Sequence, residues 1–220
     1  MRIIRIIISF TLLLFIVTNL TAQAPDTIVQ KIDENTYTLD QIEIDLAKQE
    51  ITFPAEVNMD RGLIETIIVG PKGKLHETIF KTQVMPSYIQ TSLLLLGLEC
   101  GQNMEPGDFR IKPKGDSIAV YAMWTDSLGV LHKERAENLV WNTPKNRQML
   151  ETPWVFLGSK IINGQFVADI EQNIMRTYHD PFAILHNPLT TNLDDTFYEV
   201  NQNTVPPPGT NVNIVVKSLN

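Results

Sequence analysis

Apolar and polar residues alternate over short stretches of this chain, and that alternation predicts β-strands. Ile42, Ile44 and Leu46 alternate with acidic residues, which is typical of a strand with one buried face. Residues 50–53 resume the extended pattern and Pro54 ends it, since proline lacks the N–H that a sheet needs. We expect these two runs to pair as antiparallel neighbours.

Further apolar runs predict more strands and two hairpins. Leu63–Val69 and Lys74–Phe80 flank a short loop that begins and ends with glycine, a pattern that favours a hairpin. Ser117–Trp124 is apolar on both faces and is expected inside a sheet. Asn163-Gly164 is a strong two-residue hairpin signal. Residues 212–216 alternate after a proline-rich segment and are expected to form an edge strand.

One helix stands out among these strands. Pro86 can open a helix because its missing N–H costs little there, and Ile89 and Leu93 recur at helical spacing. Gly97 is suited to end it. The sequence thus predicts an α+β fold, with a mostly antiparallel sheet built from hairpins and one buried helix near 86–97.

The first 24 residues have the layout of a secretory signal peptide. Arg2 and Arg5 precede an apolar stretch over 6–17, and Ala22-Gln23-Ala24 supplies small residues at the spacing of a cleavage site. We expect cleavage within 22–24 and export to the periplasm or the extracellular space. Retention as an anchor is the alternative, although a bilayer span needs about 20 predominantly apolar residues and polar residues dilute this stretch.

The rest of the chain is expected to form one domain behind a short leader. Residues 25–41 are polar at their start and are expected to be a loose N-terminal leader. Residues 42–220 are long enough for a single domain with its own core. Pro144 and Pro153 lie in the stretch 142–153, which we interpret as a surface connection within that domain.

Charge and cysteine content exclude several kinds of partner and cofactor. The chain has 18 basic and 25 acidic side chains, a formal net charge of −7, and an acidic domain without a basic cluster is not expected to bind nucleic acid. Cys100 is the single cysteine, so four-cysteine zinc and iron–sulfur sites are excluded. No two histidines stand at a zinc-binding spacing. We therefore expect no metal, no cofactor, and no membrane span once the signal peptide is removed.

Glu65, His76 and Glu77 are the candidate catalytic residues. In the expected hairpin, Val69 would pair with Lys74, which places Glu65 and His76 on one face within reach of a carboxylate–imidazole contact. Glu77 would lie on the other, more apolar face. In the functional interpretation Glu65 orients His76, and Glu77 transfers protons or binds a ligand. In the alternative interpretation these groups form a solvated face, and Glu77 pairs with an arginine.

A second set of residues is the candidate for ligand binding: Gly158, Ser159, Asp169 and Asp180. Ser159 and Asp169, together with His179, could also supply a Ser/His/Asp triad, but the G-x-S-x-G elbow is absent. The alternative is structural, because a glycine gives the backbone room and aspartates cap turns. The isolated histidines His132 and His186 are expected at the surface.

Blocks of sequence, in order along the chain, resemble the YdjY-like family of exported bacterial proteins. The blocks are G-L-I-E (62–65), G-K-L-H-E-T (73–78), L-L-L-L-G (93–97), W-V-F-L-G-S (154–159), F-V-A-D (166–169) and V-P-P-P-G-T (205–210). The resemblance covers about residues 42–216, and the candidate residues above match its pattern. It implies no particular reaction. Some members carry a ferredoxin-like label, from which this chain departs because one cysteine cannot hold a four-iron cluster.

These features favour an exported, non-catalytic protein that binds a small molecule or a partner protein in the cell envelope. The signal peptide, the acidic composition and the lack of a catalytic motif carry this hypothesis. A hydrolase that uses Glu65, His76 and Glu77 is the alternative. A redox accessory protein is the second alternative.

Overall fold

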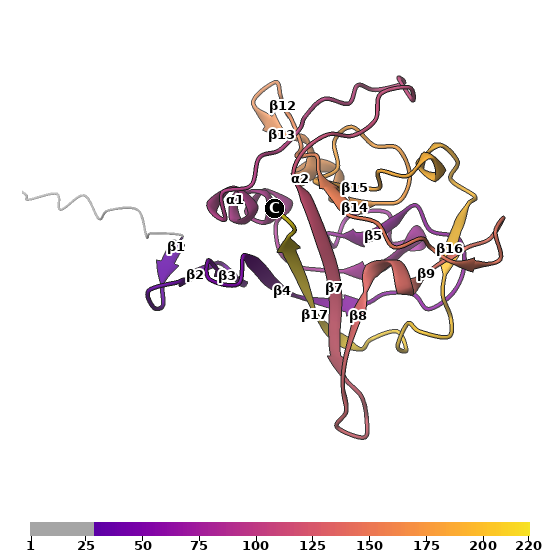
Figure 1. Cartoon of the computed structure of the whole chain (residues 1–220), viewed down its shortest axis with the longest axis horizontal. Coiled ribbons are helices and arrows are strands. Elements are labelled where there is room, and N and C mark those ends of the chain that lie inside the picture. The colour runs from indigo at the N-terminus through magenta and orange to yellow at the C-terminus, as the bar shows by residue number, and fades with distance from the viewer. Residues whose placement is uncertain (1–28) are drawn as a thin grey trace, which may run out of the picture.

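The main feature of the computed structural model, which describes residues 29–220, is a closed β-barrel (Figure 1). The predicted signal peptide lies outside the described residues. In sheet order, the eight barrel strands of the described chain are β4 (Glu50–Val57), β17 (Asn211–Ser218), β7 (Ser117–Thr125), β11 (Trp154–Phe156), β15 (Leu185–His186), β14 (Asn173–Arg176), β5 (Thr66–Val69) and β6 (Thr78–Lys81). Pairing of β6 with β4 closes the ring, where Val57 lies opposite Phe80.

Alternate residues of the barrel strands fill its interior, because neighbouring side chains of a strand point to opposite faces. Phe53 lies opposite Ile214 across the β4–β17 pair, and Phe156 lies opposite Leu185 across the β11–β15 pair. All four are buried. Full burial of such a side chain stabilises the fold by about 1.5–3 kcal/mol. The interior is therefore a packed core.

Further strands extend the sheet beyond the ring. Three continue from β4 in antiparallel order: β3 (Ile42–Asp45), β2 (Thr36–Leu39) and β1 (Val29–Lys31). Another, β8 (Leu131–Arg135), pairs with β7 outside the ring. Two small sheets lie apart, one of β10 (Arg147–Gln148), β9 (Val140–Asn142) and β16 (Tyr198–Val200), the other of β12 (Ile161–Ile162) and β13 (Gln165–Phe166).

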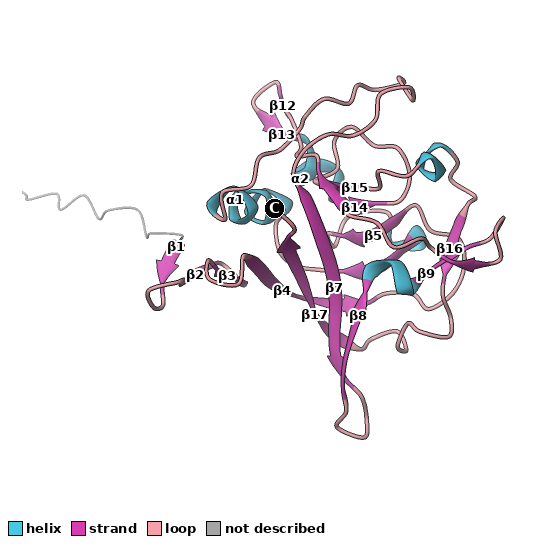
Figure 2. Ribbon diagram, viewed as in Figure 1, coloured by secondary structure: helices cyan, strands magenta, loops and turns pink. Residues whose placement is uncertain are grey.

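Helices form a small part of the described chain (Figure 2). They are α1 (Pro86–Leu95) and α2 (Val167–Glu171), with short 3-10 turns η1 (Leu75–Glu77), η2 (Ala136–Leu139) and η3 (Thr190–Leu193). The predicted helix is confirmed as α1, with Pro86 as its first residue and Gly97 in a left-handed conformation after its end. Its burial is incomplete, because Leu94 and Leu95 are about half exposed. Within residues 29–220, no helix has the length and apolar character needed to cross a bilayer.

The predicted fold class, an α+β fold with a hairpin-built antiparallel sheet, is wrong, because the described chain is a mostly-β closed barrel. The barrel contains two parallel strand pairs, β5–β6 and β14–β15. Residues 63–80 were expected to form a hairpin but instead supply the parallel pair β5–β6, in which Thr66 pairs with Thr78 and Ile68 with Phe80. After the loop that starts at Gly70, η1 returns the chain to the beginning of β5, where β6 starts.

The other strand predictions have mixed outcomes. β3 and β4 pair as expected, β7 lies inside the sheet, and β12 and β13 flank Asn163-Gly164. The expected edge strand β17 is instead central, between β4 and β7, because its prolines precede the strand. The leader expected over 25–41 forms β1 and β2 from Val29 onward, and its first residues lie outside the described part. The stretch 142–153 carries β10.

Candidate ligand-binding site

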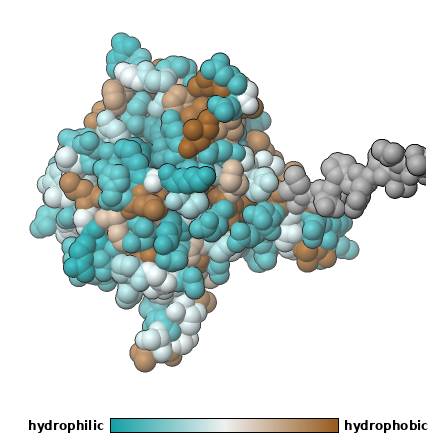
Figure 3. Space-filling model, turned by 180° about the vertical axis from the view of Figure 1, so that it is seen from behind, coloured by the Kyte–Doolittle hydropathy of each residue, from teal (hydrophilic) through white to brown (hydrophobic). Residues whose placement is uncertain are grey.

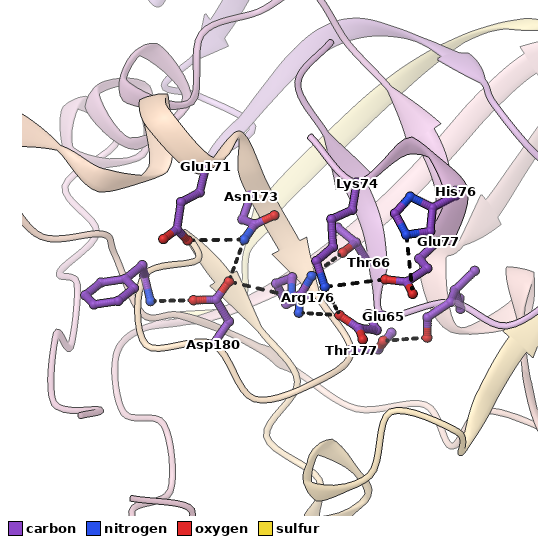
Figure 4. A network of polar contacts seen from close by, with 12 residues as sticks. Glu65, Thr66, Lys74, His76, Glu77, Glu171, Asn173, Arg176, Thr177 and Asp180 are labelled. Carbon is purple, nitrogen blue, oxygen red and sulfur yellow. Dashed lines mark hydrogen bonds and ion pairs between the residues drawn. The ribbon is translucent and has the colours of Figure 1, made fainter. Parts of the chain in front are cut away.

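A buried arginine organises a polar network on the flank of the barrel (Figure 4). Arg176, the last residue of β14, donates from Nη1 to Thr66 Oγ1 and from Nη2 to Glu65 Oε2, each at 2.8 Å. Its Nε lies 3.6 Å from Asp180 Oδ2. Because a guanidinium loses hydration when it is buried, it needs such anionic partners. Antiparallel pairing of β5 with β14 places Arg176 opposite Thr66, and so brings it next to Glu65, which directly precedes β5.

Glu65 is shared by two cations. Its Oε2 also accepts a hydrogen bond from Lys74 Nζ at 2.9 Å. Burial alone would raise the pKa of Glu65, but the hydrogen bonds and charges of Lys74 and Arg176 outweigh burial and lower it. The same contact with Glu65 raises the pKa of Lys74. Glu65 is therefore an ionised carboxylate whose Oε2 accepts from two cations, and it is poorly suited to act as a general acid or base near neutral pH.

His76 and Glu77 lie on η1, beside this network rather than at its centre. His76 is 76% exposed, and its Nε2 lies 3.6 Å from Glu77 Oε1. Glu77 Oε2 in turn lies 3.5 Å from Lys74 Nζ. The contact predicted between Glu65 and His76 depended on the hairpin register, and the parallel register replaces it with the contact between Glu65 and Lys74. A catalytic role for Glu65, His76 and Glu77 stays a prediction.

Asp180 anchors the opposite end of the network. Its Oδ2 accepts from Asn173 Nδ2 at 2.8 Å, and its Oδ1 accepts from the backbone N–H of Phe182 at 2.8 Å. Burial and the charge of Asp180 together raise the pKa of Glu171, which lies on the far side of Asn173 (Figure 4). Two carboxylates thus accept from one amide, and within the described chain the Oδ1 of that amide is buried without a hydrogen-bond partner.

His186 is buried in the structure, so the expectation of a surface position is wrong. Its Nε2 accepts the backbone N–H of Asp180 at 3.1 Å, which places the ring proton on Nδ1. Nδ1 then donates to the backbone carbonyl of Asn187 at 2.8 Å. Burial lowers the pKa of His186 to about 4, so this ring is neutral at neutral pH and its polar atoms are satisfied.

His179 is the opposite case. It is 7% exposed, and within residues 29–220 both its ring nitrogens are buried without a hydrogen-bond partner. Its ring lies 4.5 Å from the Phe109 ring and 6.1 Å from the His186 ring, measured between centroids. Phe109 belongs to the long irregular connection between α1 and β7 and is itself partly exposed. A neutral imidazole can both donate and accept a hydrogen bond, and here it does neither.

Three of the candidate binding residues, Gly158, Ser159 and Asp169, lie at the junction of α1 and α2. Asp169 Oδ1 accepts the backbone N–H of Ser87 at 2.7 Å, at the start of α1. Ser159 Oγ accepts the backbone N–H of Ala168 at 3.1 Å, at the start of α2. Gln90 of α1 returns a contact, since its Oε1 accepts the backbone N–H of Ser159 at 2.8 Å. Each helix start is therefore capped by a side chain from outside that helix.

Gly158 serves the same junction. It has a φ of +76°, and a Cβ added there would lie 2.5 Å from Cys100 Cβ. The glycine is required by both its conformation and its neighbour. With Ser159, Asp169 and His179 engaged at separate places, the structure does not assemble the triad considered from the sequence.

Arg176 and Phe109 contact the candidate residues but are not among those predicted from the sequence. A charged residue directly after the apolar pair Ile174-Met175 was the available signal for Arg176. Phe109 carried no such signal, because its packing on His179 joins segments far apart in the chain. Among the described residues, no group of three or more His, Cys, Asp or Glu side chains is placed to hold a metal ion.

An eight-stranded barrel with a buried ionic network on its flank is the class of structure that these observations define. The chain matches the YdjY domain over residues 42–217 and belongs to the YdjY domain family. This confirms the resemblance found in the sequence. No curated protein and no solved structure matches the chain.

Proposed function

We propose that this is a non-catalytic, exported binding protein of the bacterial cell envelope, and that its ligand site lies around His179, beneath Phe109. Export is supported by the basic, apolar and small-residue pattern of the first 24 residues. The binding role is supported by one observation, the gathering of unpartnered buried polar atoms in a single place.

In the described chain, four of the six such atoms belong to residues 173–179: Asn173 Oδ1, Arg176 Nε, which lies 3.6 Å from Asp180 Oδ2, and both ring nitrogens of His179. The other two are Glu77 Oε2 and Trp154 Nε1. The first four belong to residues that contact Asp180 or precede it directly in the chain. Buried polar groups in native proteins are normally paired, and each unpaired one costs about 1–3 kcal/mol. A ligand that pairs with several of them at once would recover that free energy on binding.

The chemistry of these atoms restricts the ligand. Arg176 Nε donates, Asn173 Oδ1 accepts, and the imidazole of His179 offers one donor and one acceptor. A small polar molecule with both donors and acceptors fits this set better than a purely anionic or purely apolar one. Phe109 covers the imidazole with its ring, so its loop must move aside for a ligand to reach His179.

A thermal-shift screen tests the proposal. The full chain is heated with panels of amino acids, monosaccharides, nucleosides and dicarboxylates. A ligand at 100 times its Kd stabilises the folded state by about 2.7 kcal/mol, which corresponds to roughly 5–11 °C in Tm for a chain of this size. We expect a concentration-dependent shift for at least one panel member. His179→Ala should abolish the shift, because it removes the proposed ligand contact. The variant should still fold, because the imidazole makes no hydrogen bond within the described chain.

His132→Ala is the matched control, since His132 lies on β8 and pairs with Asp126. It should keep the ligand response of the wild-type protein. The proposal is refuted if no panel member shifts Tm and native mass spectrometry of the exported protein shows no retained small molecule. A shift that survives unchanged in His179→Ala would equally refute this location.

A further inference from the structure

The β7–β8 hairpin carries an apolar surface that the proposed ligand site does not use. The two strands pair as far as Thr125 and Leu131. Figure 1 shows this hairpin projecting from the barrel, and Figure 3 shows hydrophobic colour at the end of the projection. Leu128, Val130 and Leu131 are 87%, 52% and 63% exposed. Aliphatic residues gathered on one exposed tip indicate an interaction surface, whereas single exposed ones do not.

The turn at the tip pairs part of its own backbone. Asp126 Oδ1 accepts the N–H groups of Leu128 at 2.8 Å and Val130 at 2.9 Å. The Asp126 carbonyl accepts the N–H of Gly129, and the Asp126 N–H donates to the carbonyl of Val130, each at 3.0 Å. Such internal pairing lowers the cost of moving these backbone groups out of water. Docking on a protein sheet edge would instead use free backbone groups.

The one carboxylate of the turn, that of Asp126, has a partner on each of its oxygens. Asp126 Oδ2 lies 2.8 Å from His132 Nε2, and the His132 ring stacks on Trp124 with centroids 5.1 Å apart. The hydrogen bond from His132 is the main cause of the lowered pKa of Asp126. Beside the hairpin, a hollow of about 370 Å³ is lined by apolar and amide groups, among them Met123 and Asn213. A molecule with both an apolar and a polar part suits an apolar tip that lies beside a hollow lined by apolar and amide groups.

We infer that the turn over 126–130 inserts its aliphatic side chains into a zwitterionic phospholipid surface. The acidic balance of the chain, at −7, disfavours an anionic surface. Burial of apolar side chains then supplies the attraction, which does not depend on salt. This inference goes beyond the proposed ligand site and does not rest on it.

A fluorophore at the tip tests the inference in the full chain. Ser127→Cys, made in a Cys100→Ala background, is labelled with a nitrobenzoxadiazole dye and titrated with phosphatidylcholine vesicles. We expect its emission to rise and shift to the blue as the tip leaves water. Leu128→Glu should lower the apparent partition coefficient by about tenfold or more. The comparison with Leu128→Glu separates tip insertion from membrane attachment through the first 24 residues, because both proteins keep those residues.

Leu150→Glu is the matched control, since Leu150 is 54% exposed and lies outside the hairpin, and it should behave as the parent does. Unfolding temperatures verify that each variant folds, and Val130→Glu repeats the test at a second tip residue. The inference is overturned if the tip dye shows no change at any lipid concentration. It is also overturned if the leucine variant responds like the parent, or if only anionic vesicles at low salt give a signal.

Discussion

The capping of α1 by Asp169 of α2 gives a prediction whose magnitude can be worked out from the structure. The residue before α1 is Met85, whose side chain makes no cap hydrogen bond, and the first turn contains no acidic residue. Asp169 therefore supplies the cap from α2, through its contact with Ser87. We predict that Asp169→Ala destabilises the whole domain, although Asp169 was a candidate for ligand binding.

The magnitude follows from two additive effects. Loss of a side-chain cap costs about 1 kcal/mol, and loss of a negative charge at the start of a helix costs a further 0.3–1 kcal/mol or so. A total of about 1–2 kcal/mol lowers Tm by roughly 2–8 °C in a domain of this size. Asp169→Asn keeps an acceptor but no charge, so it should be destabilised by about half as much as Asp169→Ala.

Calorimetry and urea unfolding measure these changes in the free energy of unfolding, and a double-mutant cycle tests whether the two caps are coupled. Ser159→Ala removes the cap of α2, and we expect the pair to be coupled by at least about 0.5 kcal/mol because both contacts hold one junction. Asp194→Ala is the control, since Asp194 bonds only locally to Thr196. An Asp169→Ala protein that unfolds within 1 °C or so of wild type would refute the capping argument.

Three other changes test the packing and the network. Gly158→Ala should lower the urea midpoint through its positive φ and its approach to Cys100, and Cys100→Gly should restore part of the loss whereas Cys100→Ser should not. Glu65→Gln should cost about 1–3 kcal/mol at pH 7. Because the folded-state pKa of Glu65 is lowered from 4.5, that difference should be full above pH 4.5 and vanish as pH falls through the folded-state value. For His186, whose pKa is lowered from 6.5 to about 4, wild-type stability should decline as pH falls across that window, and His186→Gln should flatten the decline. Equal pH profiles for variant and wild type would contradict either titration argument.

Local patterns along the chain predicted those elements whose partners are close in sequence. The α1 helix, the β3–β4 pair and the Asn163-Gly164 turn depend on neighbouring residues, and all three are present. The closed barrel depends on the pairing of β4 with both β6 and β17, which joins the two ends of the domain. No short-range pattern contains that information, since periodicity reports which face is buried but not which strand covers the edge.

The candidate site shows the same limit at the level of single residues. Thr66–Val69 and Thr78–Lys81 are both short, mostly apolar runs that begin with threonine, so their pattern is compatible with both an antiparallel and a parallel pair. A hairpin would have aligned Lys74 with Val69 and placed His76 near Glu65. The parallel register instead leaves His76 in solvent and brings the Lys74 ammonium onto Glu65. One choice of strand direction thus decides whether Glu65 meets an imidazole, which could support catalysis, or a second cation, which fixes it as the anionic partner of Arg176.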